Sequence, residues 1–381
     1  MTNGSTNYIK HEIILMIFKK NKYLTLFITL IILASCSTTS KNLEIHSPEL
    51  KTHDSKDFKE IMDYHSYSLY DLETIQRIIE SDILDQKQLR DAKLLKNNYQ
   101  KILSKKKYSL ELKLDQKYSK EIIELIYKFN LPVEILWNEN KQSSLPKNLL
   151  TDKINGFCSS IYDDAINSIN KVINEKSNSI LVIYSKEYEF IIKDLKLNNS
   201  NFMTMEYDST NFQEFSAKVF GINFSEKRFK KISNLNPNQD LNFIPRSRSD
   251  LNQVIILLRP QEYKSMIPAL RYHGDKHFEY FNFISSLEDI TNPLQLLDYE
   301  DSWAPISRYV TRKIQKDELT ALGKFLELGA LHEWLLVEFL KQAGVQSANI
   351  NGVTGSIIFQ SNSCSKRIIP LQKISSNLFS P

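Results

Sequence analysis

Few residues of this 381-residue chain have the types and spacing that catalysis requires. Seven histidines are present, but no two form the HExxH arrangement in which a helix presents two zinc ligands and a general base. His273, Asp275 and His277 lie close together, and the polarity of a loop that follows a helix explains them without a metal or acid–base role. There is no GxSxG nucleophile motif, and the 9 glycines form neither a GxGxxG nor a Walker-type phosphate loop. The sequence therefore predicts no enzyme activity, no metal site and no cofactor.

Three charged residues, Arg246, Arg248 and Asp250, precede a strongly apolar strand pattern. Their side chains are candidates for contact with an anion or a protein partner. The alternative is a solvated, salt-bridged entry to the strand, and exposed ion pairs of this kind add little stability. We favour this alternative and keep the three residues as the candidates for partner binding.

Two acidic positions and one His–Glu pair have structural explanations. Asp163 and Asp164 come where a helix is expected to begin, and negative charge is favourable at the positive end of a helix dipole, so we expect them to cap the helix. His332 and Glu333 fall inside a long helix, where we expect a surface or half-buried position rather than metal binding.

Cys36 is the residue with the most specific chemistry. Residues 23–34 form an apolar run preceded by Lys19, Lys20 and Lys22, which is typical of a secretory signal because a membrane-spanning helix needs about 20 apolar residues. The run ends in Leu-Ala-Ser-Cys at 33–36, which resembles the bacterial lipobox and implies diacylglycerol attachment to Cys36. A serine follows Cys36, the pattern associated with export to the outer membrane, and translation could start at Met1 or at Met16.

The other two cysteines are Cys158 and Cys364. An oxidising compartment such as the periplasm allows a disulfide between them. Because they are distant in sequence and lie in different motifs, we expect two buried free thiols instead.

Net charge excludes one class of partner. The chain carries a formal charge of +4, but residues 1–35 hold four lysines against one glutamate, so the rest is close to neutral. No polybasic segment indicates nucleic-acid binding.

The elements that must position these residues follow an α/β pattern. Residues Gln253–Leu258 form an apolar run expected of a strand buried on both faces, Pro260 suits the first turn of the following helix, and a second strand follows, which makes one βαβ unit. Other expected helices are 57–107 (two or three), 119–129, 165–174, 186–197, 212–220 and 321–343; other expected strands are 108–114, 131–138 and 179–185, with a closing hairpin at 353–359 and 366–371 and mostly loop at 287–305.

The order of these motifs resembles the outer-membrane lipoproteins that activate penicillin-binding proteins (the LpoA family). The resemblance rests on the lead-in at 245–250, Arg259-Pro260, IPALRYHG at 267–274, LPVEILWN at 131–138 and NGVTGSIIF at 351–359. It implies a two-lobed α/β fold like that of type I periplasmic binding proteins, with parallel sheets flanked by helices and preceded by a short α-helical segment. The expected parts are a lipoprotein signal peptide (1–35), a tether (36–56), a helical segment (57–107) and the binding-protein-like domain (108–381).

The resemblance also implies a function. It is that of a lipoprotein anchored by Cys36 on the periplasmic face of the outer membrane, which binds a class A penicillin-binding protein and stimulates transpeptidation. The alternative is a lipid-anchored solute-binding protein for an amino acid or amide that feeds a transporter. A polar cleft would favour the solute-binding protein, and an apolar or filled cleft would favour the activator.

Overall fold

The computed structural model describes residues 72–379 except 82–83, 114–116, 130, 139–144, 175–178, 199–201, 209–210, 236, 238–240, 275–276 and 316–320. The expected signal peptide and tether, with Cys36, lie outside the described residues, and so does Asp275.

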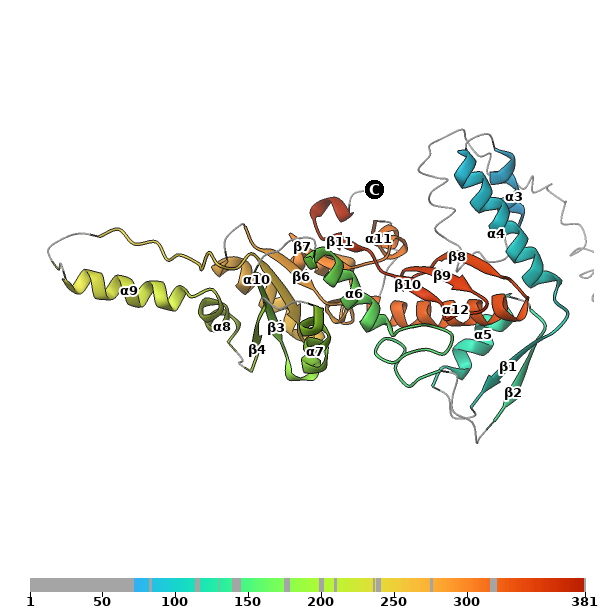
Figure 1. Ribbon diagram of the computed structural model, residues 1–381, viewed down its shortest axis with the longest axis horizontal. Helices are drawn as coiled ribbons and strands as arrows, with labels where there is room; N and C mark the ends of the chain where they lie inside the picture. Colours follow the sequence, from blue (N-terminus) through green and yellow to red (C-terminus); the bar gives the residue numbers. More distant parts are fainter. Residues whose placement is uncertain are drawn as a thin grey trace, which may run out of the picture. The chain divides into compact units, whose positions relative to one another are not determined.

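The largest sheet among the described residues has six strands (Figure 1). Its order is β11-β7-β6-β5-β3-β4, and all neighbours are parallel except the edge pair β11 and β7. The strands are β3 (Ile180–Tyr184), β4 (Phe202–Glu206), β5 (Gln253–Leu257), β6 (Glu279–Asn282), β7 (Ser302–Pro305) and β11 (Leu371–Lys373). The chain runs from β3 outward to β4 and then returns to β5 on the other side of β3, so the topological switch point lies between β3 and β5.

Helices cover both faces of this sheet. The connection from β3 to β4 moves toward one edge of the sheet, and the connections from β4 to β5 and from β5 to β6 move toward the other edge. Because these crossovers are right-handed, their helices lie on opposite faces of the sheet. Consistent with this, α6 (Ile161–Asn174) packs on α7 (Glu189–Asn198), and α8 (Phe212–Val219) packs on α10 (Pro260–His273). Every residue of β5 is buried, as its apolar sequence predicts for a central strand.

A second parallel sheet precedes the first in the sequence. It contains β1 (Tyr108–Leu112) and β2 (Val133–Trp137), joined by α5 (Ser119–Phe129). Before it come α3 (Leu72–Glu80) and α4 (Gln86–Ser104), and a capping box at Asp85 begins α4. The predicted fold class is therefore confirmed: parallel sheets flanked by helices and preceded by a helical segment.

The C-terminal part adds two helices and an antiparallel sheet. The helices are α11 (Arg308–Gln315) and α12 (Leu322–Gln342), and the sheet has the order β10-β9-β8, with β8 at Ser347–Asn351, β9 at Ser356–Gln360 and β10 at Lys366–Ile368. The antiparallel pair β9 and β10 is the predicted closing hairpin. Short 3-10 helices are η1 (Lys186–Tyr188), η2 (Ile284–Leu287), η3 (Pro293–Tyr299) and η4 (Ser376–Phe379).

The structure corrects the prediction of two free thiols. Cys158 and Cys364 form a disulfide, with Cα atoms 4.9 Å apart. Two backbone hydrogen bonds hold their segments together: Cys158 N to Ser365 O at 2.9 Å and Ser365 N to Gly156 O at 2.8 Å. A contact across 206 positions leaves no local signal in the sequence.

Some elements were not predicted. Helix α9 (Ile222–Leu235) and strands β4, β7 and β8 are present where the sequence indicated loop or no element. Strand β4 has no fully buried residue, and the buried residues of β8 alternate with exposed ones over only five positions, so neither has a long apolar run.

Candidate functional site

A pocket of about 430 Å³ lies where four separate segments meet. The first segment follows β1 and enters α5, the second contributes Leu150 from a turn between β2 and α6, the third follows β6 and η2, and the fourth is the first two turns of α12. Loops that follow parallel strands and the ends of helices are the usual lining of ligand sites in α/β proteins. The lining residues are Lys117, Tyr118, Glu121, Leu150, Glu288, Asp289, Gly323, Lys324, Glu327 and Leu328.

Glu288 is the most strongly positioned carboxylate of the pocket. Its Oε1 accepts a hydrogen bond of 2.6 Å from Oη of Tyr162, which lies in the first turn of α6. The Tyr162 ring is held by an edge contact with Phe283, with 4.7 Å between centroids. Burial raises the pKa of the Glu288 carboxyl above its ordinary value. A cation that enters the pocket would therefore meet a carboxylate with little water around it.

The segment that enters α5 carries Lys117, whose ammonium group has two partners. It donates a hydrogen bond of 2.9 Å to Tyr118 Oη, which is the main reason that the pKa of Lys117 is raised, and lies 3.6 Å from Glu327 Oε1. Glu121, in the first turn of α5, has one buried oxygen, Oε2, with no hydrogen-bond partner among the described residues. This segment thus supplies both a positioned cation, Lys117, and a carboxylate oxygen, Glu121 Oε2, that can accept a hydrogen bond.

The N-terminal end of α12 also lines the pocket. Its N-cap residue, Ala321, has φ 53° and contributes no side-chain hydrogen bond to the first turn. Leu322 N donates to Ile290 O at 2.7 Å, which fixes this end of the helix beside Glu288 and Asp289. At Gly323 a Cβ atom would lie 2.3 Å from Glu288 O, so only glycine allows this close approach. A 21-residue helix therefore directs the positive end of its dipole toward the pocket.

Six of the ten lining residues are charged, two lysines and four carboxylates. Together with the amide end of α12, this arrangement can bind a carboxylate and an ammonium group at the same time. The residues come from four segments of the sequence and form no local motif, so sequence reasoning did not identify them.

The switch point between β3 and β5 is a second place where α/β proteins bind ligands. Here Ser185 Oγ donates to Glu262 Oε2 at 2.6 Å, and Arg259 donates from Nε to Oε1 at 2.9 Å and from its backbone N to Oε2 at 3.0 Å. Although burial opposes ionisation, these hydrogen bonds lower the pKa of Glu262. The polar groups at this crevice are therefore already paired with one another.

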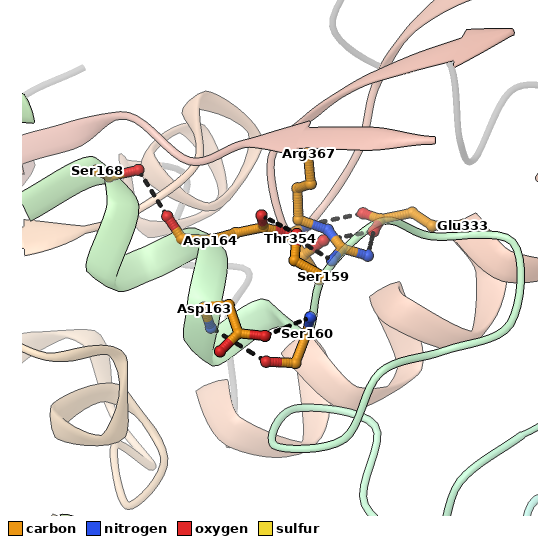
Figure 2. A network of polar contacts seen from close by, with 8 residues as sticks. All are labelled: Ser159, Ser160, Asp163, Asp164, Ser168, Glu333, Thr354 and Arg367. Carbon is orange, nitrogen blue, oxygen red and sulfur yellow. Dashed lines mark hydrogen bonds and ion pairs between the residues drawn. The ribbon is translucent and has the colours of Figure 1, made fainter. Parts of the chain in front are cut away.

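A buried polar cluster connects α6, α12 and β10, as Figure 2 shows. Arg367 Nη1 lies 3.2 Å from Asp164 Oδ2, and Arg367 Nη2 lies 3.5 Å from Glu333 Oε2. Glu333 also accepts from Thr354, through the backbone N at 2.7 Å and through the hydroxyl. Burial raises the pKa of Asp164 and of Glu333, and the guanidinium opposes this effect.

This cluster corrects two expectations. The prediction that His332 and Glu333 are on the surface or half-buried is wrong, because their exposed fractions are 7% and 0%. Ser160 caps α6, since its Oγ accepts from Asp163 N at 3.1 Å, and Asp163 completes this capping box by accepting from Ser160 N at 3.0 Å. Asp164 instead pairs with Arg367, 203 positions later.

The three candidates for partner contact lie beside each other but outside the pocket. Arg248 pairs with Asp250 through Nε and Oδ1 at 2.7 Å, and Arg246 is bound through its backbone N to Ser225 Oγ at 3.3 Å. Among the described residues, no group of three or more His, Cys, Asp or Glu side chains is placed to hold a metal ion. None of the described helices is both long and apolar enough to cross a membrane.

No family model matches this chain, and no curated protein matches it in sequence. Solved structures similar to it include a Rhodospirillum rubrum protein described as a branched-chain amino acid ABC transporter (11% identity, 71% of this chain and 97% of that chain, TM-score 0.41). Another is an ABC transporter substrate-binding protein from Desulfitobacterium hafniense in complex with Leu (8% identity, 71% and 98%, TM-score 0.36). These similarities are distant, and the α/β assignment above rests on the sheet topology.

Proposed function

We propose that this protein is a non-enzymatic binding protein whose pocket takes a small solute with an ammonium and a carboxylate group, such as an amino acid or an amino-acid amide. The observation that carries this proposal is the composition of the pocket: a helix N-terminus and two lysines beside a half-buried, hydrogen-bonded glutamate. A polar cleft is the feature expected of a solute-binding protein, whereas an activator would need only a docking surface.

The carboxylate of the solute would bind at the N-terminal end of α12. Backbone amides and the helix dipole favour an anion there, and Lys324 extends from the same turn. Hydrogen bonds in which one partner is charged contribute roughly 1.5–3 kcal/mol each, so two such contacts give about 3–6 kcal/mol, and micromolar affinity, about 8 kcal/mol, requires further contacts with the pocket lining.

The ammonium group would bind at Glu288. Since burial already raises the pKa of this carboxyl, a bound cation would stabilise its ionised form, and binding would release a proton at a pH near that pKa. The unpartnered Oε2 of Glu121 offers a second acceptor.

Isothermal titration calorimetry of the purified chain against the amino acids and their amides tests this proposal. Glu288→Gln and Lys324→Ala should each weaken binding at least about tenfold, because each removes a charge-assisted contact. Glu338→Gln and Lys341→Ala are matched controls, since both residues lie on α12 outside the pocket. If no amino acid or amide binds, or if the controls weaken binding as much as the pocket variants, the proposed function is wrong.

The location of the protein is part of the proposal. Acylation of Cys36 would anchor the mature chain to a membrane, and two or more acyl chains give stable attachment. Labelling cells with radioactive palmitate should mark the wild-type chain and not Cys36→Ser. An unlabelled wild-type chain would remove the lipid anchor from the proposal.

A second function, activation of a class A penicillin-binding protein, has one observation in its favour. The first parallel sheet has only two strands among the described residues, and its β2 strand leaves Leu136 and Trp137 exposed by 46% and 43%. A reduced first sheet suits a surface for a protein partner better than a closing solute trap. Pull-down of the class A enzyme with the lipid-free chain, followed by a transpeptidation assay, distinguishes the two functions: faster crosslinking without solute binding would favour the activator.

A further inference from the structure

Helix α9 and residues 241–250 form a unit that we name the basic arm. The extended segment returns alongside the helix, as Figure 1 shows. The Phe229 and Phe243 rings stack with 4.3 Å between centroids and 15° between planes. Arg246 N donates to Ser225 Oγ at 3.3 Å, and Arg248 N donates to Phe220 O at 2.9 Å. These contacts give the arm a defined structure along its length.

The basic arm leaves large apolar side chains in solvent. Ile222 is the only buried residue of α9, whereas the exposed fractions of Phe224, Ile232 and Leu235 are 69%, 49% and 84%. Ile244 on the returning segment is 74% exposed. Single exposed apolar residues are common, but four on one small unit that has almost no core of its own form a patch that indicates a binding surface.

The charge of the basic arm is strongly positive. Helix α9 and residues 241–250 contain six lysines and arginines against two acidic residues, Glu226 and Asp250, although the whole chain has a formal charge of only +4. The ion pair between Arg248 and Asp250 neutralises one of these cations at the base of the arm. The cations Lys227, Arg228, Lys230 and Lys231 are all exposed on α9.

Positive and apolar side chains share one face of α9. Phe224, Arg228, Lys231 and Leu235 are spaced by four, three and four residues, so they line up along the helix, and Ile232 flanks them. Membrane-surface helices usually separate an apolar sector from a charged sector. The row on α9 instead has apolar residues at both ends and two cations between them, and aromatic residues and arginine are both enriched in protein–protein interfaces.

We propose that the basic arm is a docking site for a protein partner with an acidic surface that also offers apolar pockets. Phe224, Ile232 and Leu235 enter those pockets, and Arg228 pairs with a carboxylate between them. The lysines of α9 attract the acidic surface at a distance and make association depend on salt. The proposal is independent of the solute pocket, because none of the pocket residues belongs to the arm.

The test begins with a photo-crosslinking amino acid at position 232 of the full chain in its own cells, with position 190 as the control. Phe190 is 54% exposed on α7, and Lys193 on the same helix is exposed, so α7 supplies matched controls for both kinds of residue. A protein crosslinked at position 232 and not at position 190 is then identified, purified and titrated against the wild-type chain by calorimetry at low and high salt.

The expected partner has an acidic patch, and raising the salt concentration weakens its binding. The double variant Arg228→Glu, Lys231→Glu and the single variant Phe224→Ala each lower the affinity at least tenfold, while Lys193→Glu and Phe190→Ala change it less than twofold. Since all these side chains are exposed, thermal melts should match the wild type.

Three results would overturn the proposal. One is the absence of a protein crosslink at position 232. Another is binding of the wild-type chain to vesicles of phosphatidylglycerol and phosphatidylethanolamine that the double variant loses, which would make the arm a membrane-binding element. The third is an affinity that charge reversal leaves unchanged.

Discussion

Removing Arg367 should destabilise the fold more than most single substitutions would. The exposed fraction of its side chain is 1%, and its guanidinium is the cation that the buried carboxylates Asp164 and Glu333 face. The guanidinium also lies over the Phe157 ring, 4.4 Å from the centroid. Arg367→Met fills much of the same volume but leaves two buried carboxylates without a counter-ion. Breaking a buried ion pair on one side costs roughly 3–5 kcal/mol.

The loss should grow with pH. Burial raises the pKa of Asp164 and Glu333 in the folded state above their values in the unfolded chain. For such an acid the folded state binds the proton more tightly, so its contribution favours folding at low pH and is lost as the pH rises through the folded pKa. Without Arg367 these pKa values rise further. The difference in unfolding free energy between the variant and the wild type should therefore be larger at pH 8 than at pH 5.

Urea unfolding followed by circular dichroism at both pH values measures this difference. The triple variant Arg367→Met, Asp164→Asn, Glu333→Gln is the control, because it removes the buried charges together and should recover most of the loss. A loss below about 1 kcal/mol, or one that is equal at both pH values, would refute the view that the arginine compensates two buried charges.

Three further predictions concern the disulfide and the pocket. Replacing Cys158 and Cys364 by serine opens a loop that spans 206 positions and should lower the unfolding free energy by roughly 5 kcal/mol, measured by urea titration against the oxidised wild type; an unchanged midpoint would contradict it. Gly323→Ala places a Cβ atom 2.3 Å from Glu288 O, so it should lower the unfolding free energy by about 1–3 kcal/mol and weaken solute binding. Gly344→Ala is the control: its Cβ would have no atom within 4 Å, so despite its φ of +72° it should lower the unfolding free energy less and leave binding unchanged. Solute affinity should fall as the pH is lowered through the raised pKa of Glu288, because the protonated carboxyl cannot pair with an ammonium group; calorimetry from pH 8 to pH 5 checks this, and Glu288→Gln should lose the pH dependence.

The elements that were predicted correctly are those with a strong local signal. Strand β5 is apolar at four of its five positions and buried throughout, and α10 begins at Pro260 and ends before Gly274. Helix α9 was missed because most of its side chains are polar or charged, so its few apolar residues do not form the dense periodic face by which a helix is recognised in sequence.

The sites could not be predicted because they depend on contacts between distant positions. Glu288 bonds to Tyr162 across 126 positions and lies against Gly323 at the start of α12, and neither pair has a motif. Glu333 resembled a surface residue because glutamate inside a helix is usually exposed, and only Arg367, from a separate strand, makes its burial tolerable. Arg246, Arg248 and Asp250 were named from the sequence as candidates for partner binding, and that role stays a prediction, whereas their neighbour α9 was not predicted.

The bond between Cys158 and Cys364 makes most of the described chain a single covalent ring. A protease that cuts once at any point between these two residues opens the ring without releasing a fragment. The nicked protein would keep the mobility of one chain on a non-reducing gel and separate into two bands only after reduction. The ring includes the solute pocket residues from Glu288 to Leu328 and the whole basic arm, so a cut within either would leave both attached to the rest of the molecule.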